Sequence, residues 1–234
     1  MTEFEKTVAN IEDEYSRLEH SRGWRFLYTP KRTFDQKTKL ALIGLNPGGE
    51  RGNNGPSSKE DGNAYRVERW GRGKHGRNPL QEQICLLYSL IAEQVPGSTA
   101  DSLMDETFSA NFCSFHSKSW RLLHEREKSI ESARKLWTGI LTFIHPRVLI
   151  ALGKETAREL SGILESQGGL RSEECSISTE WGGIKCRYWI FRLGEREILF
   201  VELPHLSRFR VFGRKEHATW HLKLIEAIAA RLNE

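Results

Sequence analysis

The sequence predicts an α/β fold, with three layers in the order α/β/α around a central, mostly parallel sheet. Short apolar runs alternate with amphipathic helical segments, which is typical of helices that connect parallel strands. Several of these runs are apolar at every position, as expected of strands covered on both faces. The chain has 234 residues, of which 38% are hydrophobic, and this size suits a single domain over residues 1–234.

The first part of the chain predicts one helix, one strand and a long insertion. Residues 3–20 have a helical pattern, and residues 40–43 form an apolar run that ends at Gly44. A polar stretch follows from about residue 50 to residue 78, and loops of this length in compact domains are usually functional or disordered. We therefore expect an insertion loop between the first strand and the next helix.

A clear helix start follows this insertion. Asn78 can cap the helix, Pro79 suits its first position, and Gln81 completes a capping box. The helix continues through the largely apolar segment QEQICLLYSLIAEQ, and residues 108–113 (FSANFC) predict the second strand.

The middle of the chain predicts an amphipathic helix and a third buried strand. His145-Pro146 ends the helix, because proline cannot continue it, and residues 148–152 (VLIAL) form the strand. Gly153 and another helix (KETARELSGIL) come next. The apolar positions of the amphipathic helix follow the i, i+3, i+4 rule, and they are Ala133, Leu136, Trp137, Ile140, Leu141 and Ile144.

The C-terminal part predicts a hairpin and a last helix. Residues 184–191 alternate between apolar and polar, and they pair with residues 198–203 across a turn at residues 193–195. The last helix is expected from about residue 215 to residue 232.

Three polar side chains follow predicted strands closely. Asn46, Asn111 and His205 each come at or just after the end of such a strand. In open parallel sheets, ligands bind in the crevice beyond the carboxyl ends of the strands. We therefore expect these three residues to share one crevice.

Composition excludes some classes of protein and leaves others open. The net charge of +4 at pH 7 permits an anionic partner without requiring one. No apolar run approaches the roughly 20 residues of a membrane span, and the acidic, helical N-terminal segment is no signal peptide, so we expect a cytoplasmic protein without a membrane partner. The cysteines lack C-x-x-C spacing and predict free thiols rather than a zinc site or disulfides, and they are Cys85, Cys113, Cys175 and Cys186.

The glycine-rich segment after the first strand has two interpretations. Gly44 and Gly49 have the spacing of a phosphate-binding loop, but Glu50 stands where that motif needs lysine, and no serine or threonine follows for Mg²⁺. We therefore reject binding of a nucleoside triphosphate. Taken alone, residues 46–49 are best described as an ordinary tight turn.

Two segments combine basic and aromatic residues, as nucleic-acid-binding surfaces do. The segment after His205 is equally well explained as a solvated turn before the last helix. The segment in the insertion is also compatible with a merely soluble loop. These residues are Arg208, Phe209, Arg210, Phe212, Arg214 and Lys215 in the first segment, and Tyr65, Arg66, Arg69, Trp70, Arg72, Lys74 and Arg77 in the second.

One histidine pair has a spacing that zinc ligands can have. His217 and His221 are four residues apart in the predicted last helix. The pair lacks the glutamate of a metalloprotease motif, and no third ligand is evident. An exposed or packing role is favoured, and we expect no metal and no other cofactor.

Together, these motifs resemble the uracil-DNA glycosylase superfamily over residues 38–215. Residues 44–48 have the G-x-N-P-G form of its mismatch-specific and single-strand-selective branches. Residues 205–207 are similar to its His-Pro-Ser motif, with Leu206 in place of proline, and PRVLIALGKETA is similar to its central strand and helix. Asn111 in SANFCSF looks like the asparagine that reads the base. The cysteines do not match the iron–sulfur branch, so no metal cluster is expected.

The resemblance implies a role for each site residue. His205 would donate a hydrogen bond to the oxyanion that develops on the leaving base, and Asn46 would hold the attacking water. Asn111 would pair with the edge of a flipped pyrimidine. Gly48 stands where the branch strictest for uracil has tyrosine, so the pocket would admit C5-modified pyrimidines. The other implied contacts are Gly44, Leu45, Pro47 and Phe112 to the substrate (with Tyr65, Trp70 and Phe112 as stacking candidates), and Ser207, Arg208, Phe209, Arg210, Arg72 and Lys74 to DNA.

The implied function is that of a monofunctional DNA glycosylase, acting as a monomer on DNA without metal or cofactor. It would flip out uracil or a C5-modified pyrimidine and hydrolyse its N-glycosidic bond, in base excision repair or in defence against phage DNA with modified bases. One alternative is a non-catalytic nucleic-acid-binding module with the same fold. A weaker alternative is a hydrolase of free nucleosides, which the basic segment after His205 disfavours.

Overall fold

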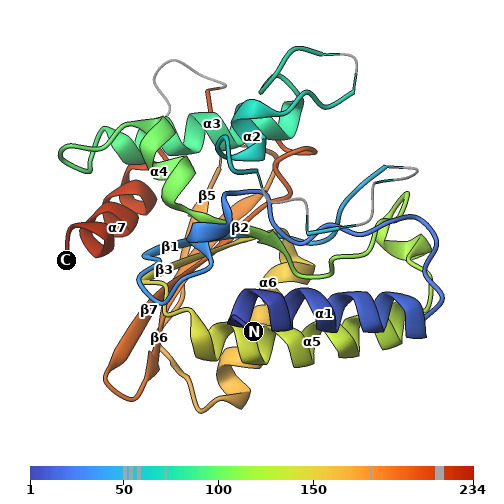
Figure 1. Cartoon of the computed structure of the whole chain (residues 1–234). Helices are drawn as coiled ribbons and strands as arrows, with labels where there is room; N and C mark the ends of the chain where they lie inside the picture. Colours follow the sequence, from blue (N-terminus) through green and yellow to red (C-terminus); the bar gives the residue numbers. More distant parts are fainter. Residues whose placement is uncertain (50–51, 53–54, 57–58, 72, 180, 214–218) are drawn as a thin grey trace.

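A computed structural model of the chain has a seven-stranded sheet between two layers of helices (Figure 1). It describes residues 1–234 except residues 50–51, 53–54, 57–58, 72, 180 and 214–218. The predicted fold class, a three-layer α/β/α arrangement with a central, mostly parallel sheet, is confirmed.

The sheet combines a parallel part with an antiparallel edge. Its strands are β1 (Leu40–Gly44), β2 (Phe108–Asn111), β3 (Val148–Leu152), β4 (Leu170–Arg171), β5 (Cys175–Ser178), β6 (Lys185–Leu193) and β7 (Arg196–Leu203). The strand order is β2-β1-β3-β7-β6-β4, with β5 also paired to β6. β2, β1, β3 and β7 are parallel neighbours, whereas β6 pairs antiparallel with β7, β4 and β5. Because the chain goes from β1 to one side and then returns to the other, the strand order reverses at β1, where such sheets bind ligands.

The helices form one layer on each face of the sheet. On one face lie α1 (Glu3–Arg17), α5 (Arg126–Phe143) and α6 (Lys154–Ser166), and on the other lie α3 (Pro79–Ala92), α4 (Ala100–Glu106) and α7 (Leu222–Asn233) (Figure 1). The short helix α2 (Ala64–Val67) contacts α3, and 3-10 helices span Lys31–Thr33 and Trp120–Leu122. No helix in the described part of the chain is long and apolar enough to cross a membrane.

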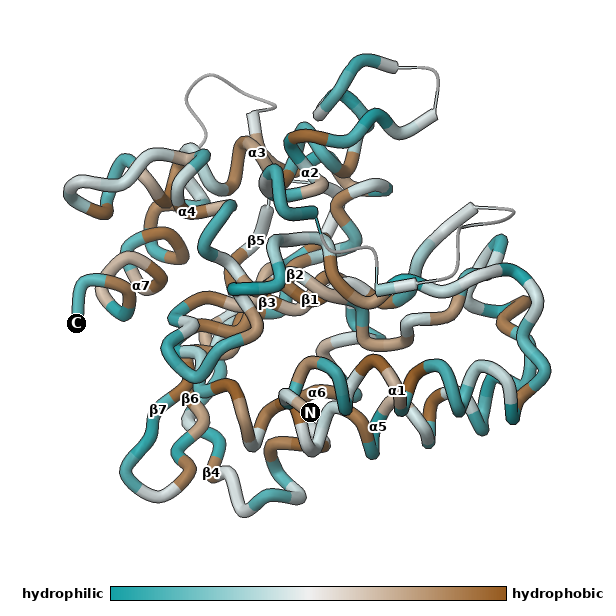
Figure 2. Tube along the Cα trace, viewed as in Figure 1, coloured by the Kyte–Doolittle hydropathy of each residue, from teal (hydrophilic) through white to brown (hydrophobic). Residues whose placement is uncertain are grey.

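Alternate residues of the central strands build two hydrophobic cores. In β1, Ala41 and Ile43 pack with the layer of α1, α5 and α6, whereas Leu40 and Leu42 pack with the layer of α3, α4 and α7. All residues of β1 are buried, as its continuous apolar run predicts. Figure 2 shows the hydrophobic colour concentrated in the central strands and the hydrophilic colour in the surrounding loops.

Several predicted elements are confirmed. α3 begins at Pro79, and Asn78 and Gln81 form the expected capping box. α5 ends at Phe143, directly before the segment in which His145-Pro146 was expected to stop it, and its predicted apolar face packs against the sheet. β6 and β7 form the predicted antiparallel hairpin.

Several element boundaries differ from the prediction. α1 ends at Arg17 and not at residue 20, and β6 and β7 both extend further towards their shared turn than predicted. β2 ends at Asn111 instead of continuing through Cys113, because its partner strand β1 ends opposite Asn111. α7 begins at Leu222, later than predicted, because the Leu222 amide closes a turn by donating to the Thr219 carbonyl. Residues 214–218 of the predicted helix lie outside the described residues.

The helices α2 and α4, the strands β4 and β5 and both 3-10 helices were not predicted. The insertion expected as a loop contains α2, which Asn63 caps by accepting a hydrogen bond from the Tyr65 amide. The Asn63 side chain is fully buried and donates to the Met104 carbonyl at the end of α4, 2.9 Å away. The second half of the insertion is therefore tied to the core of the protein.

Candidate active site

A cleft of about 1120 Å³ lies beyond the carboxyl ends of the parallel strands. Its lining comes from the segments that follow β1 and β7, from the end of β2, from the insertion and from residues 116–120. Asn46, Asn111 and His205 all line it, so the structure brings together the three polar residues that follow separate strands. We call these three residues the strand-end wall of the cleft.

Asn46 is held by its amide nitrogen. Its Nδ2 donates to Ser117 Oγ at 2.8 Å, and to the carbonyls of Pro47 and Phe115 at 3.1 and 3.3 Å. The Ser117 hydroxyl in turn donates to the Ser119 carbonyl at 2.9 Å, which leaves its oxygen free to accept. The Asn46 Oδ1 atom has no hydrogen-bond partner among the described residues, so the side chain offers a fixed acceptor.

The loop after Asn46 runs alongside the segment that contains Ser117, and there is open space next to Gly48. The Ser117 amide donates to the Pro47 carbonyl, and Gly48 forms a β-bridge with Ser117. Gly49 has a φ of +108°, a backbone conformation that favours glycine. A methyl group added to Gly48 would meet no atom within 4 Å, so this side of the cleft has room for a larger group.

Asn111 explains why β1 ends in glycine. Gly44 and Asn111 are register partners at the ends of β1 and β2. A Cβ atom on Gly44 would lie 2.5 Å from Asn111 Oδ1, so any other residue would displace this side chain. Asn111 Nδ2 donates to the Tyr28 hydroxyl at 2.8 Å, and the asparagine is only 3% exposed. Its amide is therefore fixed at the inner end of the cleft.

His205 lies in a tight turn two residues after β7. The amides of Arg208 and Phe209 both donate to its carbonyl, and its Nδ1 lies 2.8 Å from Ser207 Oγ. Leu206, which stands where the resembling motif has proline, is completely buried in the core. Burial of this leucine and the turn hydrogen bonds fix the segment without a proline.

The surroundings of His205 favour its neutral form. Partial desolvation in the cleft lowers the pKa of His205 below its ordinary value, and the charge of Arg208 lowers it further. When Ser207 donates to Nδ1, the proton of the neutral ring is on Nε2, which has no protein partner among the described residues. His205 is then a hydrogen-bond donor toward the cleft.

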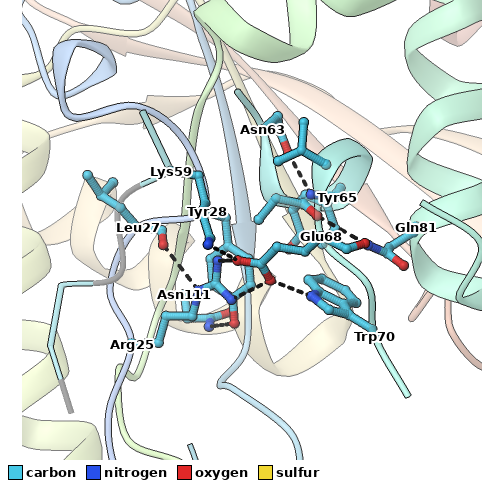
Figure 3. A network of polar contacts seen from close by, with 12 residues as sticks. Arg25, Leu27, Tyr28, Lys59, Asn63, Tyr65, Glu68, Trp70, Gln81 and Asn111 are labelled. Atoms are coloured by element: carbon cyan, nitrogen blue, oxygen red, sulfur yellow. Dashed lines mark hydrogen bonds and ion pairs between the residues drawn. The ribbon is translucent and has the colours of Figure 1, made fainter. Parts of the chain in front are cut away.

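A second part of the cleft lining is an aromatic wall, which meets the strand-end wall at the Tyr28–Asn111 hydrogen bond and consists of Arg25, Tyr28, Tyr65, Glu68 and Trp70 (Figure 3). Tyr28 and Tyr65 are stacked, with ring centroids 5.3 Å apart and ring planes 13° apart. The Arg25 guanidinium lies 3.9 Å from the centroid of the Tyr28 ring. Trp70 meets both tyrosines edge to face, at 6.1 and 5.2 Å. Tyr28 and Tyr65 are almost fully buried, so the half-buried Trp70 is the ring of this wall that a planar ligand can reach.

Glu68 holds the aromatic wall together. It accepts two hydrogen bonds of 2.8 Å from Arg25 and one from the Trp70 indole, and Lys59 Nζ lies 3.6 Å away (Figure 3). Burial alone would raise the pKa of Glu68, but the hydrogen bonds from Arg25 and Trp70 outweigh it, so the pKa lies below its usual value. Glu68 is therefore an ionised structural partner and has no free oxygen to act as a base.

Most of the predicted substrate-contacting residues line the cleft, but Phe112 does not. Gly44, Leu45, Pro47 and Gly48 line it together with Ser207, which was assigned to DNA. Phe112 is completely buried on the other face of the sheet, where its carbonyl accepts a hydrogen bond from the Trp137 indole. Successive residues of a strand point to opposite faces, so when Asn111 points toward the cleft side, Phe112 points away. Phe112 is therefore unsuited to stack on a ligand. Of the other two candidates, Tyr65 lines the cleft but is only 2% exposed, which favours the half-buried Trp70.

The predicted DNA-contacting cations that the structure describes lie outside the cleft lining. Arg208 and Lys74 are exposed, and Phe209 is half-buried beside Trp181, with ring centroids 6.3 Å apart. Arg210 lines a separate cleft of about 720 Å³. Arg72, which was also assigned to DNA, lies outside the described residues. So do Arg214 and Lys215 of the basic segment and His217 of the histidine pair.

The sequence missed several residues of the cleft. Arg25 and Tyr28 come from the irregular segment before β1, in which the stretch WRFLY was the only signal of burial. His116, Lys118 and Trp120 come from the segment after β2. Burial lowers the pKa of His116, and its buried Nδ1 atom has no hydrogen-bond partner in the described structure.

The described residues contain no group of three or more His, Cys, Asp or Glu side chains that could hold a metal ion. All four cysteines are free thiols. Comparison with models of known protein families finds no match, and comparison with curated proteins finds none either.

Proposed function

We propose that the protein is a DNA glycosylase that hydrolyses the N-glycosidic bond of uracil or of a C5-modified pyrimidine. The observation that supports this best is the convergence of Asn46, Asn111 and His205 from three strand ends on one cleft. The motifs that contain these residues resemble those of the uracil-DNA glycosylase superfamily and follow the same order along the chain.

The proposed reaction breaks the bond between C1′ of the deoxyribose and N1 of the base. The bonding electrons leave with the base and make one of its carbonyl oxygens an oxyanion, while the sugar becomes oxocarbenium-like and is attacked by water. Charge thus develops at two places in the transition state. Groups that stabilise these charges more strongly in the transition state than in the ground state accelerate the reaction.

His205 is suited to stabilise the negative charge on the leaving base. Ser207 engages Nδ1 at 2.8 Å, so Nε2 is the nitrogen that can donate a hydrogen bond to the base oxyanion. The lowered pKa favours a neutral ring at pH 7, and a neutral imidazole stabilises the anion without transferring its proton.

Asn46 is suited to orient the attacking water molecule. Its Nδ2 is committed to three acceptors, so its Oδ1 can accept a hydrogen bond from water in one orientation. An amide oxygen orients a water molecule but does not take its proton at neutral pH, so the proton passes to solvent after the attack. This role suits a reaction in which the bond to the base breaks before the water adds.

The cleft suits a nucleotide that has left the helical stack. Chemistry at N1 and C1′ requires the target nucleotide to be flipped out of the duplex or to lie in a single strand. The volume of about 1120 Å³ slightly exceeds the roughly 300–1,000 Å³ of typical small-molecule sites, as expected for a nucleotide with part of its strand. Arg69 and Lys118 are exposed cations in the cleft lining, and the space at Gly48 suits a substituent at C5.

The test is a screen with oligonucleotides that contain uracil or different C5-modified pyrimidines, single-stranded and in duplex. Excision leaves an abasic site, which alkali cleaves, so the expected result is an alkali-dependent break at the modified position. Asn46→Ala and His205→Ala proteins serve as controls for contaminating activity. Binding without cleavage of any substrate would support the non-catalytic nucleic-acid-binding module instead.

A further inference from the structure

We propose that Tyr28 is a base-reading residue: its hydroxyl donates to a carbonyl oxygen of the bound base while its oxygen accepts from Asn111. This role rests on the proposed function, because it assigns a specificity determinant to the same cleft. Tyr28 belongs to none of the motifs described above, and it lies before β1 in an irregular segment.

The Tyr28 ring has a fixed position. It stacks on Tyr65, and the Arg25 guanidinium lies 3.9 Å from its centroid. Arg25 is itself fixed by two hydrogen bonds to Glu68 and by one from its Nε to the Leu27 carbonyl, at 3.2 Å. The Tyr28 side chain therefore has little freedom, and its hydroxyl is preorganised (Figure 3).

The Tyr28 hydroxyl has a proton to donate into the cleft. Its oxygen accepts from Asn111 Nδ2 at 2.8 Å, so the hydroxyl proton must point elsewhere. No acceptor for this proton lies among the described residues, and Tyr28 lines the cleft although it is only 6% exposed. Burial raises the pKa of Tyr28, so the proton stays on the phenol at every working pH. A nearly buried donor without an acceptor is a group that a ligand can satisfy.

The Asn111 amide is oriented by the same hydrogen bond. Because Tyr28 engages Nδ2, the amide oxygen lies on the other side, directly over Gly44. The Tyr28 hydroxyl and the Asn111 amide thus present a donor next to an acceptor. A pyrimidine with a carbonyl at C4 and a hydrogen at N3 matches this pattern, whereas cytosine presents an amino group where the carbonyl is needed. Tyr28 would therefore make the cleft reject cytosine.

The experiment compares Tyr28→Phe with Tyr88→Phe, which also removes a phenol hydroxyl. Tyr88 is completely buried in the same hydrophobic core and does not line the cleft, so it is the matched control. The probes are single-stranded oligonucleotides with one 2′-fluoro-2′-deoxyuridine or one 2′-fluoro-2′-deoxycytidine, whose glycosidic bonds resist cleavage. Affinities for both probes, melting curves and single-turnover excision of uracil are measured.

Tyr28→Phe is expected to weaken binding of the uridine probe about tenfold and to leave binding of the cytidine probe unchanged, because one neutral hydrogen bond is removed. Tyr88→Phe should preserve the preference for uridine. An unchanged preference in Tyr28→Phe, or an equal loss on both probes, would overturn the role. If the wild-type protein excises nothing but prefers the uridine probe through Tyr28, the glycosylase proposal fails and the reading role stands. If Tyr28→Phe excises uracil and discriminates as the wild type does, the reading role fails and the glycosylase proposal stands.

Discussion

The two walls of the cleft are built in different ways. Each residue of the strand-end wall is positioned by the backbone at the end of a strand or just beyond one, within a sheet whose register fixes its neighbours. The aromatic wall is positioned by side chains that meet across the chain, and Arg25 and Glu68 are 43 residues apart. One wall thus depends on topology and the other on a single ionic and aromatic network. Mutations should therefore affect the two walls differently.

The largest expected effect comes from a substitution in the strand-end wall that removes a proposed catalytic group and leaves the fold intact. Asn46→Ala removes the acceptor that we propose for the attacking water, so it should lower single-turnover uracil excision on the order of a hundredfold or more, with DNA affinity nearly unchanged. Ser117→Ala removes only the best acceptor of the Asn46 amide at 2.8 Å, so it should cause a smaller loss of rate. A near-normal rate in Asn46→Ala would remove this residue from the mechanism.

The next largest effect is on stability, and it comes from a substitution that removes the carboxylate holding the aromatic wall together. Glu68→Gln leaves Arg25 without its carboxylate, and their side chains are only 16% and 14% exposed. Loss of one partner of such a pair should lower the free energy of unfolding by about 3 kcal/mol, measured by urea denaturation. Glu131→Gln is the matched control, since its pair with Lys135 is exposed, and it should leave the midpoint nearly unchanged. Equal midpoints for both variants would contradict the structural role of Glu68.

Acid should destabilise two parts of the molecule over different pH ranges, because His20 packs beside α5 and Glu68 belongs to the aromatic wall. Burial of His20 beside Ser129 lowers its pKa to about 4 from an ordinary value of 6.5. The unfolded chain therefore takes up this proton first, and stability should fall by about 2 kcal/mol as the pH drops from 6.5 to 4. The lowered pKa of Glu68 acts later, since its contribution is present above pH 4.5 and is lost as the pH falls through the folded pKa. Urea titrations of wild type and His20→Gln across this range test the first window, and parallel curves would refute it.

Salt dependence tests whether the exposed cations near the cleft bind phosphates. Affinity for DNA should fall steeply with salt, because each cation bound to a phosphate releases counterions. Arg208→Glu with Arg210→Glu should reduce the slope of log affinity against log salt by about one for each phosphate that these arginines neutralise. Lys135→Glu, an exposed cation on α5 in the opposite helix layer, should leave the slope unchanged. An affinity that is the same at low and moderate salt would argue against a DNA partner.

The strand-end wall was predictable from the sequence because short stretches of the chain determine where each strand ends. A largely apolar run that ends at or just before a polar residue indicates a buried strand that ends, and parallel strands end at the same edge of the sheet. The start of α3 was equally predictable, because Asn78, Pro79 and Gln81 satisfy its first amides without help from distant residues. These features need only neighbours in the chain.

The aromatic wall was not predictable because its partners are far apart in the sequence. Nothing in WRFLY indicates that Arg25 pairs with Glu68 in the insertion, or that Tyr28 meets Asn111. Phe112 was assigned to the cleft for a different reason. It directly follows Asn111, and neighbouring residues of an extended segment point to opposite faces of the sheet, so Phe112 packs on the face away from the cleft. The helix α2 was missed because its cap, Asn63, is stabilised by the distant end of α4.

We propose that the strand-end wall stabilises a departing base, and a change of leaving group tests this role most directly. Single-turnover excision of uracil and of 5-fluorouracil is measured with wild type, His205→Ala and Ser207→Ala, together with melting curves. Loss of the His205 donor should slow uracil excision on the order of a hundredfold, with a smaller loss for 5-fluorouracil, whose anion needs less stabilisation. Ser207→Ala should show the same pattern more weakly, because it acts through His205. Equal losses on both bases in a destabilised protein would contradict the claim.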